Sequence, residues 1–249
     1  MRKTLADYKE IILELPLKEK YTKEELLIPE LLIEKQNQLE IYYAPHNEYR
    51  NLNAKVFIIG ITPGFQQMST AIAAARRGLE QNIPMEQIQY ICKEAGRFSG
   101  VIRKNIITML DELKLPQILG IQGTKDLFGG QDHLLHTISL IPYSVFVNHQ
   151  NYSGHTPKIL KNEMLSHYVY ENFLEEYDSL KNPENVLLIP LGSAVEEVLI
   201  QLVKDGRIST EQILRGFPHP SGANVNRIST LKANKEQMIR FLNDWVKRN

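Results

Sequence analysis

The sequence predicts an α/β fold with a doubly wound, mostly parallel central sheet that is flanked by helices on both faces. Lys55–Ile61 is a continuous apolar, β-branched run that stops at Pro63 and Gly64, which is typical of a strand covered on both faces. Two more apolar runs, Ile138–Val147 and Asn185–Pro190, are separated from it and from each other by segments long enough for crossover helices. Strands joined in this way run parallel.

Length and composition indicate an ordinary globular protein. The 249 residues are 43% hydrophobic and 23% charged, as in most soluble domains. We predict a single domain over residues 1–249, with residues 1–50 as a helical N-terminal extension packed on it. No apolar run reaches the length of a membrane span, and the first ten residues lack the apolar core of a secretion signal. We therefore expect a cytoplasmic protein without a membrane partner.

Charge and cysteine content limit the kinds of site and partner that this chain can have. Cys92 is the only cysteine, so a disulfide, a thiolate zinc site and a cysteine-ligated cluster are excluded within one chain. Lys plus Arg and Asp plus Glu number 29 each, so bulk charge does not attract nucleic acid. His133, His136, His149 and His155 lack the spacing of known zinc motifs. We expect no metal and no cofactor.

The remaining elements follow from periodicity and breakers. Apolar residues spaced three and four apart predict helices, and Gly120–Gly130 is a predicted loop. The predicted helices are Leu5–Leu15, Lys23–Leu39, Met68–Gln81, Met85–Glu94, Val101–Leu113, Lys161–Leu180, one from Ser193 towards Lys204, and Thr230–Lys247. The strand over Ile138–Val147 is expected to break near Pro142, because proline cannot donate to a sheet ladder.

Ligands of such sheets bind beyond the carboxyl ends of the strands. The loops expected there are Thr62–Gln67, Asn148–Pro157 and Pro218–Asn226. In the third loop His219 lies between two prolines on a stiff backbone, which suits a positioned hydrogen-bond donor, although a surface histidine is the alternative. The first loop, GITPG, lacks the Gly-Lys-Ser/Thr ending of a phosphate-binding loop.

These motifs resemble those of a known enzyme superfamily. GITPG at Gly60–Gly64 and HPSGAN at His219–Asn224 are similar in type, order and separation to motifs of the mismatch-specific and single-strand-selective uracil-DNA glycosylases. The resemblance implies a uracil-DNA glycosylase-like fold. It also implies a DNA-repair enzyme that hydrolyses the N-glycosidic bond of uracil or a related deaminated or mismatched base, in single- or double-stranded DNA.

The resemblance also implies roles for particular residues. His219 would stabilise negative charge on the departing base, and Thr62 would orient the attacking water. Asn151 best matches the asparagine that reads the base, with Asn148 as a close rival. Phe98, in Gly96–Gly100, is the stacking candidate and Phe65 the alternative. The other implied contacts are Gly60 and Gly64 with the base and Pro220, Ser221, Gly222, Ala223, Asn224 and Arg227 with DNA.

Thr62 departs from the family pattern, which usually has Asp, Glu or Asn at this position. A threonine hydroxyl orients water but is no base near neutral pH, so the sequence predicts a slow or altered-specificity glycosylase. No lysine occupies a motif position, which argues against a Schiff-base lyase step. Two alternatives stay open: a catalytically silent nucleobase- or nucleic-acid-binding protein, and a hydrolase of free nucleosides or nucleotides. A pocket without a basic track would favour the second.

Overall fold

A three-stranded parallel sheet lies at the centre of the computed structural model, which describes residues 2–248. β3 (Val56–Gly60) is the middle strand, with β4 (Leu135–Ser139) on one side and β7 (Leu187–Pro190) on the other. A parallel bridge between Leu188 and Ile213 extends the sheet beyond β7. The predicted α/β class and its parallel strands are confirmed.

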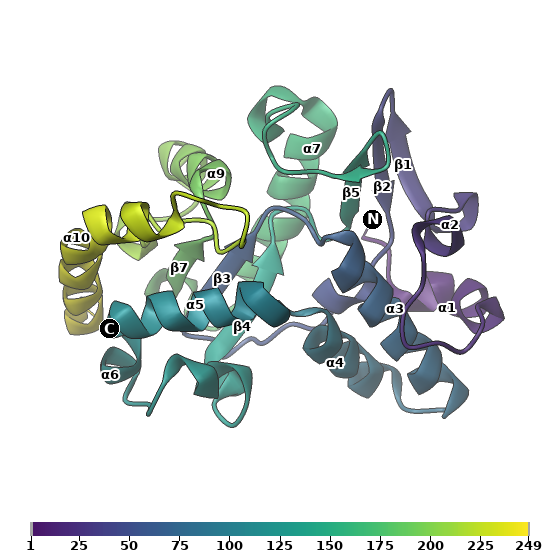
Figure 1. The fold of residues 1–249 in the computed structure, drawn as a ribbon, viewed down its shortest axis with the longest axis horizontal. Coiled ribbons are helices and arrows are strands. Elements are labelled where there is room, and N and C mark those ends of the chain that lie inside the picture. The colour runs from purple at the N-terminus through teal and green to yellow at the C-terminus, as the bar shows by residue number, and fades with distance from the viewer. Residues whose placement is uncertain (1, 249) are drawn as a thin grey trace.

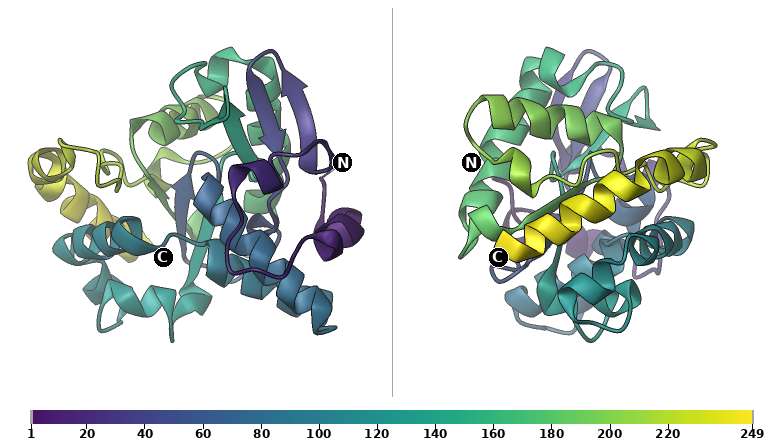
Figure 2. Two further views of the ribbon diagram at one scale, coloured as in Figure 1. Left: turned by 45° about the vertical axis from the view of Figure 1, so that its right-hand side comes forward. Right: turned by 90° about the vertical axis from the view of Figure 1, so that its left-hand side faces the viewer.

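Helices cover both faces of this sheet, as predicted. Phe57 and Ile59 of β3 belong to one apolar cluster and Val56 and Ile58 to a second, because successive side chains of a strand point to opposite faces. The first cluster includes side chains of α3 (Phe65–Glu80), α4 (Met85–Gly96) and α9 (Ser193–Lys204), and the second includes α5 (Gly100–Glu112) and α10 (Arg227–Arg248). α10 and α1 (Leu5–Glu14) lie at opposite ends of the molecule (Figures 1 and 2).

A second, antiparallel sheet is the main feature that the sequence analysis missed. It has the order β1 (Leu32–Gln36), β2 (Leu39–Tyr42), β5 (Ser144–Val147) and β6 (Gln150–Asn151), and its β1–β2 hairpin stands beside β5 in Figure 1. The predicted helix over Lys23–Leu39 is therefore wrong, since only α2 (Lys23–Leu26) is helical before a 3₁₀ turn at Pro29–Leu31. Asn37, with φ of 55°, reverses the chain, and burial of β2 against β5 outweighs the helical spacing.

The other elements follow the predictions closely. The run Ile138–Val147 does break around Pro142, but its two parts, β4 and β5, enter different sheets. The predicted Gly120–Gly130 loop contains a 3₁₀ turn at Thr124–Phe128. Within residues 2–248 no helix has the length and apolarity needed to cross a membrane. The remaining helices are α6 (Leu115–Leu119), α7 (Glu163–Tyr168), a π-helical turn at Val169–Phe173, and α8 (Leu174–Asp178).

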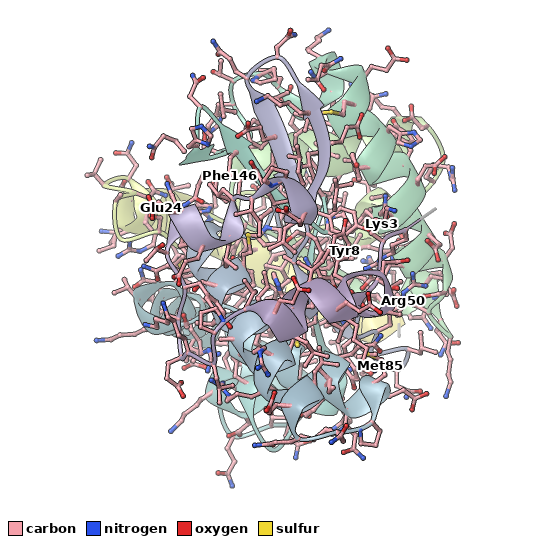
Figure 3. The ribbon with its side chains drawn as sticks, turned by 90° about the vertical axis from the view of Figure 1, so that its right-hand side faces the viewer. Lys3, Tyr8, Glu24, Arg50, Met85 and Phe146 are labelled. Carbon is pink, nitrogen blue, oxygen red and sulfur yellow. The ribbon has the colours of Figure 1, made fainter. Side chains whose placement is uncertain are left out.

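The N-terminal segment is held by a stack of rings and a buried ion pair. Tyr8, labelled in Figure 3, stacks on Tyr43 with ring centroids 4.0 Å apart. The Arg2 guanidinium lies 3.0 Å from the buried Glu176 carboxylate, which also bonds His136. Burial opposes ionisation of Glu176, but the His136 hydrogen bond and the nearby positive charges lower its pKa to about 2.

A buried histidine lies under the end of α4. A Cβ on Gly96 would lie 2.6 Å from the His46 ring, so only glycine fits over it, and His46 Nδ1 has no hydrogen-bond partner among the described residues. Burial, together with the charge of Lys93, lowers the His46 pKa to about 3.

This burial predicts acid sensitivity of the fold. The unfolded pKa of histidine is about 6.5, so the stability that depends on neutral His46 is present above that pH and is lost as the pH falls towards about 3. Between pH 6.5 and 4.5, the unfolding free energy of wild type should fall with decreasing pH. In His46→Gln, measured by urea titration, the slope of this fall should be smaller by up to about 1.4 kcal/mol per pH unit. Equal slopes for the two proteins would contradict this assignment.

Candidate active site

The three predicted loops meet around one pocket beyond the carboxyl ends of β3 and β7. Its volume is about 820 Å³, within the usual range for small-molecule sites. The three loops therefore converge at the carboxyl ends of the parallel strands, as expected. The predicted residues that line it are Gly60, Thr62, Gly64, Phe98, Asn151, His219, Pro220, Ser221 and Asn224.

Thr62 lines the pocket, but its hydroxyl bonds to two backbone groups. Thr62 Oγ1 donates to the carbonyl oxygen of Tyr143 and accepts the N–H of Val145 at 3.0 Å. A hydroxyl has one donor and two lone pairs, so one lone pair is left. Thr62 therefore ties the loop after β3 to the start of β5, and what remains for a ligand or a water is acceptance of one hydrogen bond.

The geometry separates Asn151 from its rival Asn148. Asn148 and His149, with φ of 49° and 60°, form the two-residue turn between β5 and β6, the positive-φ conformation that suits hairpin turns of this length. Asn151 follows on β6, and its Oδ1 accepts the N–H of Phe65 at 2.9 Å. Asn151 lines the pocket, and since its oxygen accepts from Phe65, its Nδ2 is the donor left for other partners, 3.8 Å from where a Cβ on Gly64 would lie.

Phe98 is held at the pocket wall by two neighbouring side chains. Its ring packs over Gly60, where an added Cβ would lie 3.8 Å from Phe98 Cζ. Arg103 donates to the backbone carbonyls of Phe98 and Arg97. Gln67 accepts the Gly64 N–H at 3.1 Å and donates to the Gly96 carbonyl at 2.7 Å, which fixes the first loop against the segment that carries Phe98.

The His219 loop is braced by its own side chains. The Ser221 N–H lies 3.2 Å from His219 Nδ1, so in the neutral ring the proton is on Nε2 and that nitrogen is a donor. Burial, followed by the charge of His155, lowers the His219 pKa below its usual value, so the ring is neutral near pH 7. Asn224 Nδ2 donates to the His219 carbonyl at 3.0 Å, and Arg227 donates to the Ser221 carbonyl at 2.8 Å.

Some predicted residues lie outside the pocket. Phe65 packs against Phe146, with ring centroids 6.4 Å apart, and contributes its backbone N–H. Gly222 and Ala223 are exposed at the tip of the His219 loop. Arg227 lines a second groove of about 460 Å³ on the α5–α10 side.

The sequence analysis did not anticipate the charge of the pocket, nor the lining residues Gly192 and Glu196. Among the described residues that line it there is neither Lys nor Arg, and Glu196 is the one carboxylate. Lysines accompany Arg227 in the α5–α10 groove instead, as Lys232 and Lys235. Gln67, Gly192 and Glu196 line the pocket and lie outside the motifs, although Gln67 is three residues after the helix cap at Gly64, a spacing that predicts a capping contact.

The Thr62 contacts predict a specific loss of stability. Thr62→Val keeps the shape but leaves the Tyr143 carbonyl and the Val145 N–H without their partner, which should lower the unfolding free energy by about 1–3 kcal/mol. Thr62→Ser retains the hydroxyl and serves as the matched control. Urea unfolding of the three proteins checks this, and a Val variant as stable as the Ser variant would refute the bridging role.

Comparison with known proteins gives one close relative. No family model matches the chain. The crystal structure of Pedobacter heparinus SMUG2 aligns with all of this chain and 97% of its own, with a TM-score of 0.41 and 14% identity, a similarity too low to support an argument about function. The uncharacterized protein YoxB of Bacillus subtilis (strain 168) is 44% identical over 225 residues, which cover 90% of this chain and 87% of YoxB. The chain therefore belongs to the same family as YoxB.

Proposed function

We propose that this protein is a monofunctional DNA glycosylase that hydrolyses the N-glycosidic bond of uracil or a related deaminated base. The observation that carries the proposal is the pairing of two hydrogen-bond donors on one pocket. His219 offers Nε2–H from a neutral, braced ring, and Asn151 offers its Nδ2 amide from a held side chain. The motif resemblance at Gly60–Gly64 and His219–Asn224 supports the same reaction class.

His219 suits the departure of the base. Cleavage of an N-glycosidic bond passes through an oxocarbenium-like sugar and leaves negative charge on the base. A neutral imidazole donor near a pyrimidine oxygen stabilises that charge as it develops, which is worth about 3 kcal/mol for one well-placed donor. Because the Ser221 N–H occupies Nδ1, the ring is already in the tautomer that this role requires.

Asn151 suits the choice of base. An amide N–H donor pairs with the carbonyl of uracil or hypoxanthine, whereas cytosine and adenine present an amino donor at the corresponding position. Two donors facing each other leave both groups without partners, which disfavours the wrong base. Phe98, which also lines the pocket, supplies an aromatic face for an extruded base.

Water activation is the weak part of this site, which supports a slow enzyme. Thr62 has one lone pair left to receive a water, and a threonine hydroxyl does not deprotonate it near neutral pH. The reaction is therefore driven by departure of the base, with water added to an already cationic sugar. A mechanism that assists departure of the base more than activation of the water agrees with the pocket, which offers two hydrogen-bond donors and has a single carboxylate among its described lining residues.

Contact with DNA is proposed for Pro220–Asn224 of the His219 loop, whose tip at Gly222 and Ala223 is exposed, and for Arg227. Next to the loop, Val225 is 90% exposed and Ile228 is 72% exposed. Exposed apolar side chains of this kind are suited to contact unstacked bases.

The absence of Lys and Arg from the described pocket lining favours a second candidate, a hydrolase of free nucleosides. Such substrates have no phosphate groups that would call for basic side chains in the pocket.

An excision assay tests the proposal. Oligonucleotides with uracil, hypoxanthine or xanthine, single-stranded and opposite each base, are incubated with the protein beside free deoxyuridine and deoxyinosine. We expect excision from DNA, and a loss of about 10²–10³-fold in kcat for His219→Ala. His167→Ala, an exposed histidine on α7, is the control.

The alternative outcomes are distinct. Cleavage of free nucleosides alone would select the second candidate. DNA binding with no cleavage of any substrate would show a silent binding protein and overturn the proposed activity.

Base reading has its own test. Asn151→Asp keeps an oxygen for the Phe65 N–H but removes the Nδ2 donor, so uracil excision should fall by about a hundredfold. Asn148→Gly is the matched control, because glycine adopts the positive φ of that turn. Unaltered uracil excision by Asn151→Asp would remove Asn151 from the base-reading role.

A further inference from the structure

Glu196 contacts the His219 loop where the loop begins. Its side chain is 16% exposed and lies in the first turns of α9. Glu196 Oε2 accepts the Gly216 N–H at 2.7 Å, and Oε1 lies 3.3 Å from Arg215 Nε. The largely buried carboxylate of Glu196 thus holds the backbone three residues before His219.

Gly216 is a point at which the chain must turn sharply. Its φ is 80°, and a Cβ there would lie 2.7 Å from Asn234 Nδ2, so only glycine fits. Asn234 Nδ2 donates to the Gly216 carbonyl at 3.1 Å, while Glu196 accepts the Gly216 N–H. Side chains from α9 and α10 therefore hold both backbone groups of this residue, and the direction of the loop depends on them.

Gly192, the residue that precedes α9, makes a second contact with the same loop. The Gly192 N–H donates to the Phe217 carbonyl at 3.2 Å, and a Cβ on Gly192 would lie 2.9 Å from His219 Cβ. Gly192, directly before α9, and Glu196, in its first turn, therefore both contact the segment Gly216–His219. The close packing at Gly192 leaves no room for His219 to move towards α9.

We propose that Glu196 is a positioning residue that fixes His219 for departure of the base. This rests on the proposed function, in which His219 acts as the donor. The carboxylate acts as an acceptor for the Gly216 N–H and holds the loop against α9. Because negative charge on the base is absent in the bound substrate and develops in the transition state, misplacement of His219 lowers kcat and leaves KM nearly unchanged.

The kinetic test compares two substitutions at one position. Glu196→Ala removes the acceptor and should lower kcat for uracil excision by at least about tenfold, since small misplacements of catalytic groups are costly, with KM near wild type. Glu196→Gln keeps an oxygen for the Gly216 N–H and should restore most of the rate. Urea unfolding confirms that both variants are folded.

Two kinetic outcomes overturn the proposal. A wild-type rate in Glu196→Ala would show that the loop does not need this contact. A loss in Glu196→Gln equal to that in Glu196→Ala would show that the negative charge matters and the acceptor does not.

A second measurement does not depend on activity. In hydrogen exchange followed by mass spectrometry, peptides covering residues 216–227 should exchange about tenfold faster in Glu196→Ala than in wild type or Glu196→Gln, while peptides of α5 are unchanged. If wild type excises no base, the proposed function fails and this exchange experiment still decides the role of Glu196. Equal exchange in all three proteins would refute that role.

Discussion

The hydroxyl of Thr62 joins the two sheets, and the site depends on this join. Thr62 follows a strand of the parallel sheet, and its two bonds reach Tyr143 and Val145 at the start of β5 in the antiparallel sheet. β6, which carries Asn151, pairs with β5. The hydroxyl of Thr62 therefore helps to set the position of Asn151 relative to the parallel sheet, which gives this threonine a structural role.

The start of α3 provides the second link between the loops. The first N–H groups of a helix have no partner within it, and here side chains supply partners from two directions. Gln67 accepts from Gly64, and Asn151 accepts from Phe65. Gln67 also reaches Gly96, so the same helix end holds both the amide and the segment of Phe98. The hydrogen bonds that satisfy the N–H groups of Gly64 and Phe65 therefore also fix the geometry of this pocket wall.

The parts of the fold with strong local signals could be predicted from sequence. β3 is a long β-branched run, the helices from α3 to α5 have clear periodicity, and loops after parallel strands must gather at one edge. The β1–β2 hairpin was not predicted, because β2 is only four residues long and all four are buried, including Glu40. Its partner β5 lies about a hundred residues further along the chain, and pairing at such a separation leaves no local pattern.

The site was predictable where motifs mark it and not where contacts are long-range. His219 lies in a stiff, recognisable loop. Glu196 occupies an ordinary helical position, and its importance arises from a loop twenty residues later that folds back onto it. Which of Asn151 and Asn148 lines the pocket depends on the length of the turn between β5 and β6, which the sequence alone left open.

The division of the pocket between two sheets has a consequence for how this family diversifies. Under the proposed function, the group that selects the base belongs to the antiparallel sheet, and the group that stabilises its departure follows the parallel one. On that proposal, a substitution in the β5–β6 hairpin would change which base is accepted without touching the group that stabilises its departure. Base selection and bond cleavage would then be able to change independently of each other.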